Sequence, residues 1–143
     1  MGVAGIENAR LRFLGVDSSA CIPILRNRSG LEQLPDPTLT GIPVIVAAEL
    51  GTGVKKNGQT HPHQFALLEA FLGMFWIVDF TLQAALHYAD IRASLEANGT
   101  AIGPLDLLLA AQARSLGATL VTENVEEFAR VRGLKILALN SAR

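Results

Sequence analysis

Residues 99–122 read GTAIGPLDLLLAAQARSLGATLVT, and this stretch decides the fold class. Pro104 suits the first position of a helix, because its fixed φ is helical and its missing N–H is not needed there. The apolar residues after it predict a helix as far as Leu116, and Gly117 suits the left-handed residue that ends a helix. The run 118–122 then predicts a strand. A helix followed at once by a short apolar strand is typical of a parallel sheet with crossover helices.

The same alternation continues in both directions from this stretch. Strands are predicted at 12–16, 42–46, 76–78, 118–122 and 134–137. Helices are predicted from Ser18 and over 47–56, 65–74, 82–97 and 104–116, with loop or irregular structure at 31–40. Asn124 and Glu127 have the spacing of a capping box at the start of a further short helix. We therefore expect an α/β fold in one domain, 1–143, with a short central parallel sheet of four or five strands and helices on both faces.

Composition narrows the class of protein. The chain has 143 residues, 50% of them hydrophobic, a net charge of −1 and one cysteine, Cys21. An internal disulfide is excluded, which suits a reducing compartment, and we expect a cytoplasmic protein without a membrane segment. High apolar content favours exposed apolar patches, so we also expect a homodimer. The helix expected to be too apolar for the surface carries Phe65, Leu68, Phe71, Leu72 and Phe75.

Three carboxylates are expected at one edge of the sheet. Asp17 follows the first strand, Glu49 lies in the first turn after the second strand, and Asp106 lies in the first turn after Pro104. Strand ends and helix starts meet at the same edge of an open parallel sheet, which is where ligands bind. Each carboxylate alone is explained by the helix dipole, which stabilises acidic groups in first turns. Three of them, each within apolar sequence, favour a shared site.

A divalent cation is the simplest partner for such a site. Carboxylates held together repel one another unless a positive charge neutralises them, and no lysine or arginine adjoins any of the three in sequence. Mg²⁺ or Mn²⁺ suits a set of oxygen ligands. Such an ion can polarise a phosphoryl oxygen and supply hydroxide at neutral pH.

Three motifs, in order and with this spacing, resemble the PIN-domain ribonucleases, most closely the VapC-type toxins of toxin–antitoxin pairs. The first is Phe13 to Ser19 (FLGVDSS), and the second is Ala48 to Val54 (AELGTGV). The third and most specific begins with Ile91 to Glu96 (IRASLE) and Gly99 to Asp106 (GTAIGPLD), and is completed by the following residues: Ala110, Ala111, Leu116–Thr122, Phe128, Gly133 and Leu134. The resemblance covers nearly all of the chain from Arg12 to about Leu137.

The resemblance implies a site and partners. It implies Asp17, Glu49 and Asp106 as metal ligands, with Asn124 at the family's fourth acidic or amide position. Ser18 and Thr122 adjoin these residues and would support them. It implies Mg²⁺-dependent cleavage of RNA phosphodiesters, with Mn²⁺ as a substitute, together with a cognate antitoxin and a second copy of the chain as partners. The first 11 residues would form an extended N-terminus.

Departures from the family pattern leave alternatives open. Ser19 and Leu105 stand where Asn is common, and Glu123 is an alternative to Asn124 for the fourth position. Two of these departures, Ser19 and Leu105, favour a catalytically weak module that binds antitoxin or RNA without cleaving it. An unrelated aspartate-dependent phosphotransfer domain is a further alternative, disfavoured because no second Asp follows Asp17 at a spacing of two.

Basic residues fall into three groups. The groups are Arg26 with Arg28, Lys55 with Lys56, and the set Arg130, Arg132 and Lys135. Each group alone is explained by solvated helix ends, where positive charge is favourable. If the chain cleaves RNA, the groups near Arg26 and Lys55 would contact its backbone, because phosphate contacts position a nucleic acid.

Overall fold

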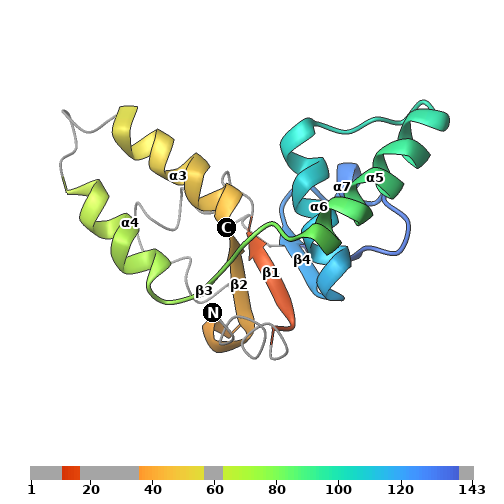
Figure 1. Ribbon diagram of the computed structural model, residues 1–143. Helices are drawn as coiled ribbons and strands as arrows, with labels where there is room; N and C mark the ends of the chain where they lie inside the picture. The colour runs from red at the N-terminus through yellow and green to blue at the C-terminus, as the bar shows by residue number, and fades with distance from the viewer. Residues whose placement is uncertain (1–10, 17–35, 57–62, 139–143) are drawn as a thin grey trace.

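The computed structural model describes residues 11–16, 36–56 and 63–138. A five-stranded sheet runs through it in the order β3-β2-β1-β4-β5, and every pairing is parallel (Figure 1). The strands are β1 (Phe13–Val16), β2 (Thr40–Pro43), β3 (Trp76–Val78), β4 (Thr119–Thr122) and β5 (Lys135–Ala138). The predicted α/β class and the short parallel sheet are therefore confirmed.

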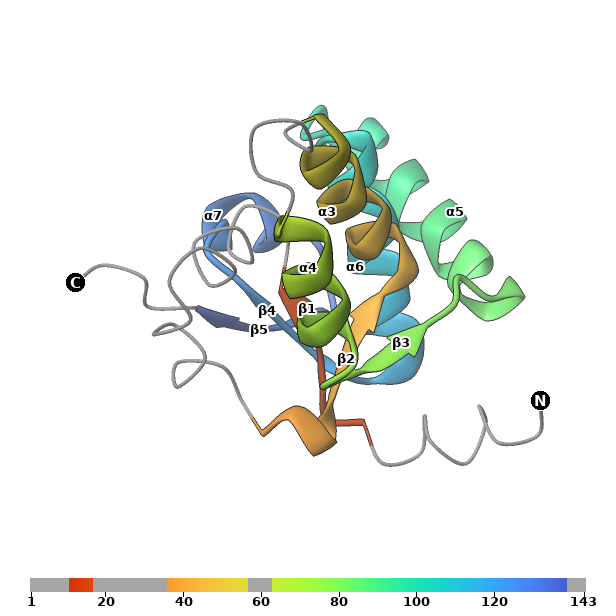
Figure 2. The same cartoon turned by 90° about the vertical axis from the view of Figure 1, so that its left-hand side faces the viewer.

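Helices cover both faces of this sheet, as predicted. One face carries α3 (Val44–Lys56) and α4 (Gln64–Leu72), and the other carries α5 (Leu82–Ala97) and α6 (Pro104–Leu116) (Figures 1 and 2). The short α7 (Val125–Phe128) joins β4 to β5, and a single 3-10 turn, η2 (Pro37–Leu39), precedes β2. No helix among the described residues is long and apolar enough to cross a membrane.

Local signals fix most element ends. Thr81 caps α5 by accepting a hydrogen bond from the Ala84 N–H, with an oxygen–nitrogen distance of 3.2 Å. Gly117 ends α6 at a φ of 65°, in the left-handed region that favours glycine. The helices predicted at 82–97 and 104–116 are observed with those bounds. The helix predicted from Ser18 lies outside the described residues.

The boundary between β2 and α3 differs from the prediction. Residues 42–46 were expected to form a strand, but β2 ends at Pro43 and the helix begins at Val44. The β-branched run is helical because Val46, Leu50 and Val54 fall on one face of a helix, and all three are buried. Tertiary packing overrides the strand propensity of these residues.

A close approach between β1 and β2 requires glycine at the end of β1. A Cβ placed on Gly15 would overlap the Pro43 ring and lie 3.0 Å from the Gly41 carbonyl oxygen. The register of β1 against β4 also shifts between Leu14 and Val16. A glycine at this irregularity lets the last residues of β1 change direction just before Asp17 in the sequence.

Two apolar clusters pack on the two faces of the sheet. The cluster beneath α3 and α4 contains Ile42, Val46, Leu50, Val54, Leu68, Phe71, Phe75, Leu109 and Val121. The cluster beneath α5 and α6 is larger and includes Leu11, Leu14, Val78, Ile91, Leu95, Leu107, Leu120, Phe128 and Val131 with several alanines of α6. Burial on both faces explains why the strands are apolar throughout rather than alternating.

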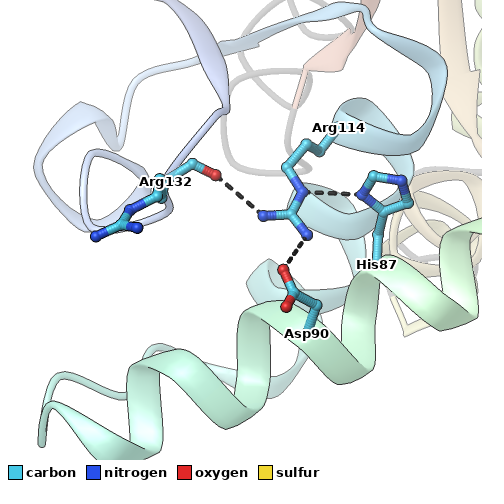
Figure 3. Close-up of polar contacts among 4 residues, drawn as sticks. All are labelled: His87, Asp90, Arg114 and Arg132. Atoms are coloured by element: carbon cyan, nitrogen blue, oxygen red, sulfur yellow. Dashed lines mark hydrogen bonds and ion pairs between the residues drawn. The ribbon is translucent and has the colours of Figure 1, made fainter.

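Arg114 ties three segments together on the outer side of α6. Its Nε donates to His87 Nδ1 at 2.9 Å, its Nη2 to Asp90 Oδ2 at 2.7 Å, and its Nη1 to the Arg132 carbonyl at 3.0 Å (Figure 3). These contacts link α6 to α5 and to the turn before β5. The guanidinium is mostly buried, so its ion pair with Asp90 is shielded on one side from solvent.

Gln112 makes a second, buried link from α6, this one to the end of β3. Its side-chain Nε2 donates to the carbonyl oxygens of Val78 and Asp79, each at 3.1 Å. The side chain is only 1% exposed. An amide that pairs two carbonyls in the interior is difficult to replace, because each carbonyl left unpaired keeps its desolvation cost.

We predict that Gln112→Met lowers the free energy of unfolding by ~1–3 kcal/mol, because two carbonyls lose their donors. Urea denaturation followed by circular dichroism measures this change. Gln83→Met, at an exposed position on α5, is the matched control and should stay within ~0.5 kcal/mol of wild type. Equal stability of both variants would show that the Gln112 link contributes nothing.

Candidate active site

Glu49 and Asp106 line one groove at the carboxyl-end edge of the sheet. The groove has a volume of about 390 Å³ and lies between the first half of α3 and the start of α6. Its other described walls are apolar and are formed by Ile45, Val46, Pro104, Leu105 and Leu109. The structure thus brings together two of the three predicted metal ligands. It also places Leu105, where the family often has Asn, on the wall of the same groove.

Glu49 lies deeper in its helix than the sequence indicated. Because α3 begins at Val44, Glu49 is in the second turn, not the first, and the first turn holds no acidic residue. The helix dipole acts mainly within the first turn. Stabilisation of a helix start therefore does not explain a carboxylate at this position, which leaves its place in the groove as the better explanation.

Asp106 is paired with a carboxylate that sequence reasoning did not assign to the site. It lies in the first turn of α6, as predicted, and its carboxyl group lies next to that of Glu127. The backbone N–H of Gly103 donates to Glu127 Oε2 at 2.8 Å. Asp106 Oδ2 and Glu127 Oε2 both lie 3.7 Å from the position that a Cβ on Gly103 would occupy. The start of α6 and the helix α7 therefore meet through two adjacent carboxylates.

Asn124 belongs to the same cluster through Glu127. Its side-chain Nδ2 donates to Glu127 Oε1 at 2.6 Å, and its backbone N–H donates to Thr122 Oγ1 at 2.9 Å. Thr122 is fully buried at the end of β4, so it fixes the turn that carries Asn124. Glu123, the sequence alternative to Asn124, is exposed.

The predicted capping box at α7 is wrong. The Asn124 side chain makes no capping hydrogen bond to the helix that it precedes. Glu127, which would have reached back to the Asn124 backbone, binds the Gly103 N–H 24 residues away and the Asn124 side chain. The long-range contact replaces the local one because it supplies a charged acceptor to the exposed backbone N–H at the start of α6.

The hydrogen bond from the Gly103 N–H lowers the pKa of Glu127 below its ordinary value, and partial burial opposes this shift. The hydrogen bond from the Asn124 side chain lowers the pKa further, as does the positive charge of Arg130. Arg130 is held near the cluster by donating from Nη1 to the Ala101 carbonyl at 3.1 Å. Glu127 is therefore ionised at neutral pH, and its neighbour Asp106 faces a negative charge.

Two residues of this cluster were missed from sequence alone. Glu127 was assigned to a cap, and Arg130 was placed in a solvated basic group. Neither adjoins Asp106 in sequence, so no local pattern could place them there. The acidic residue that follows Asn124 at a spacing of three was the only available signal.

Two expected site residues, Asp17 and Ser18, lie outside the described residues, which resume at 36 after Val16. Ser19, the first departure from the family pattern, lies outside them as well. Their roles stay predictions. Asp17 directly follows β1, the strand between β2 and β4.

The acidic side chains among the described residues are of the chemical type that binds a hard divalent cation. Asp106 and Glu127 form a contacting pair, and Glu49 lines the same groove as Asp106. Within ranges 11–16, 36–56 and 63–138, no three Asp, Glu, His or Cys side chains are close enough to hold an ion together. The donors are all oxygens, which match Mg²⁺ or Mn²⁺. A contacting carboxylate pair is also relieved of repulsion when a cation binds.

Comparisons with known proteins agree with this fold. A family model described as the PIN domain matches residues 15–134. Ribonuclease VapC2 of Rickettsia felis is 35% identical over 124 residues, which cover 83% of this chain and 92% of that protein. The tRNA(fMet)-specific endonuclease VapC of Salmonella typhimurium is 30% identical over 135 residues, covering 88% of this chain and 96% of that protein.

A solved structure gives the same answer for the fold. The DNA-bound VapBC structure from Salmonella typhimurium matches with a TM-score of 0.82 and 31% identity, covering 90% of this chain and 98% of that one. The family match extends across Glu49, Asp106 and Asn124. A phosphotransfer domain of another family is thereby excluded. The chain belongs to the PIN-domain family, among the VapC-type ribonucleases, and is a nuclease.

Proposed function

We propose that this chain is a divalent-metal-dependent endoribonuclease that acts as the toxin of a toxin–antitoxin pair. The observation that carries the proposal is the groove lined by both Glu49 and Asp106, where Asp106 also lies next to Glu127. The names of the relatives support the same reaction class, since two of them are a ribonuclease and a tRNA-specific endonuclease. A noncleaving module is the less favoured alternative.

Asp106, Glu49 and Asp17 would hold the ion, and Asn124 would complete the site. When bound, Mg²⁺ would polarise the phosphoryl oxygen and supply hydroxide at neutral pH. Glu127 holds the Gly103 N–H and the Asn124 amide, so it fixes the positions of the α6 start and of Asn124. The apolar walls of the groove exclude water from one side, which strengthens the attraction of the carboxylates for a cation.

The partners follow from the relatives. The solved Salmonella typhimurium relative is a VapBC assembly bound to DNA. We infer that this chain likewise pairs with a cognate antitoxin, and that RNA is its substrate. We also propose a cytoplasmic location, which suits both partners and a chain with a single cysteine.

A first prediction tests the metal site without an RNA target. Excess Mn²⁺ should raise the wild-type melting temperature, since an ion that binds only the folded state at 100 times its Kd adds ~2.7 kcal/mol. Asp106→Asn should gain much less from Mn²⁺. In chelator the variant should be at least as stable as wild type, because the repulsion with Glu127 is removed. Differential scanning calorimetry measures all four conditions.

Glu126→Gln is the matched control for this experiment. It removes the same charge from an exposed residue beside Glu127 and should respond to Mn²⁺ as wild type does. A wild type that ignores Mn²⁺, together with an Asp106→Asn variant mildly destabilised in both conditions, would show that Asp106 only stabilises a helix start.

A second prediction tests the reaction and the fourth position. Purified protein should cleave structured RNA with Mn²⁺ and not with chelator, and Asp106→Asn should abolish cleavage. Asn124→Ser and Glu127→Gln should each lower the rate by about 10- to 100-fold, the usual loss when a group that orients a ligand is removed. Glu123→Gln should cleave at the wild-type rate. The reverse result, loss in Glu123→Gln only, would place Glu123 at the site instead.

A third prediction concerns the homodimer, whose expected basis has changed. Leu68, Phe71 and Phe75, three of the five residues cited for it, are buried within the chain. Leu82 and Leu86 on α5 are instead 73% and 58% exposed. We predict a dimer by light scattering at micromolar concentration, and a monomer when both leucines are replaced by Glu. Leu137→Glu, on exposed β5, should stay dimeric, and a monomeric wild type would contradict the prediction.

A further inference from the structure

A second groove lies along α3, one to two turns beyond Glu49. It has a volume of about 540 Å³ and lies between α3 and the start of α4. Its described lining is Ala48, Gly51, Thr52, Lys55, Lys56 and Phe65. Nothing in the mechanism proposed above uses these residues.

The groove combines one exposed aromatic ring with two cations. Phe65 is 46% exposed, although Leu68 and Phe71 further along α4 are buried. The Lys55 ammonium lies 5.1 Å from the centre of the Phe65 ring, within the range of a cation–π contact. Lys56, the last residue of α3, lines the same space.

The floor of the groove leaves room for a flat group. Gly51 carries no side chain, and a Cβ placed there would meet no heavy atom within 4 Å. The Thr52 hydroxyl donates a hydrogen bond to the Ala48 carbonyl oxygen of the same helix at 2.9 Å, so its donor is already used within α3. The surface beside Phe65 is therefore small, open and largely apolar.

The two grooves share one helix in a fixed relation. Glu49 and Lys56 are seven residues apart, which places them on the same face of α3 and about 10.5 Å apart along its axis. An RNA strand that leaves the acidic groove along this helix passes Lys55 and then Lys56. Along the helix, the proposed cation site therefore comes first and the two lysines that would bind phosphates come second.

We propose that Phe65, Lys55 and Lys56 form a subsite for one nucleotide of single-stranded RNA next to the cleaved bond. The base stacks on the Phe65 ring, and the two ammonium groups bind the adjoining phosphates. Stacking on an aromatic ring together with backbone-directed cations is the usual way in which proteins hold unpaired nucleotides. This inference rests on the proposed ribonuclease function.

The Lys55 ammonium now over the ring can serve this site. The Lys55 side chain is exposed and flexible, so its ammonium group can leave the Phe65 ring and bind a phosphate. A base can then stack on the ring in the place of the ammonium group. The favourable position of positive charge at the end of α3 would by itself explain the two lysines. It would not explain why the Phe65 ring beside them is exposed. A bound base must be unpaired, so the subsite selects loops or single strands over continuous duplex.

The test uses an RNA octamer that carries 2-aminopurine, bound to the Asp106→Asn protein in chelator. Stacking on Phe65 should quench the fluorescence of the probe, and fluorescence anisotropy gives the affinity. Adding Phe65→Ala should abolish the quenching and lower affinity by about 5- to 150-fold, the range for one stacked base. Phe65→Trp should restore both. Adding Lys55→Ala or Lys56→Ala should each reduce the slope of log affinity against log salt by about 0.7.

Matched controls come from the opposite end of α4 and the far edge of the sheet. Met74→Ala removes an apolar side chain of similar exposure, 43%, and Lys135→Ala removes an exposed cation on β5. Neither should change quenching or affinity. A blunt RNA duplex of the same sequence should bind equally to the parent protein and to the Phe65→Ala variant.

The outcomes separate this inference from the proposed function. If Phe65→Ala binds and quenches as the parent does while wild type cleaves RNA with Mn²⁺, the subsite is wrong and the ribonuclease stands. If quenching depends on Phe65 but wild type never cleaves RNA, the subsite stands and the reaction is wrong. A Phe65→Ala variant with unchanged RNA affinity but an altered oligomeric state would make this groove a protein interface and overturn the inference.

Discussion

The parallel pairing of β1 with β2 on one side and β4 on the other is the constraint on which the site depends. Parallel strands end at the same edge, so the carboxyl ends of β1, β2 and β4 lie together although more than 100 residues separate Val16 from Thr122. Gly15 permits the close approach of β1 and β2, because a Cβ on Gly15 would overlap Pro43. The arrangement of this edge therefore depends on a residue without a side chain.

The acidic edge is stabilised by backbone donors as well as by any cation. Glu127 accepts from the Gly103 N–H at the start of α6, where the first N–H groups of a helix have no partner within the helix. Arg130 adds a positive charge nearby. These contacts offset part of the repulsion between Glu127 and Asp106, so the folded chain can hold the pair while a cation is absent.

Elements with local signals were predictable from sequence, and those set by distant contacts were not. Pro104 and Gly117 mark the ends of α6 by their own backbone preferences, and the observed helix has those bounds. The start of α3 was misplaced, because its helical form depends on the burial of Val46 against residues far away in sequence. Glu127 was missed for the same reason, since its partner Gly103 lies 24 residues earlier. The motif order supplied Asp106, Glu49 and Asn124, but it could not supply the residue that joins two of them.

The observed start of α3 changes how the charged residues of this helix are interpreted. Had α3 begun after the run 42–46, Glu49 would have been a first-turn residue and the helix dipole would have explained it. With the start at Val44, the helix dipole does not account for Glu49, whereas it does account for Lys55 and Lys56 at the far end. The helix thus carries Glu49, whose position is explained by the groove, and two lysines, whose positions at the helix end are favourable. Glu49 is the only charged residue of α3 outside its last turn, and a bound cation would neutralise it. One helix can then bind a cation and a phosphate two turns apart without a loss of helix stability.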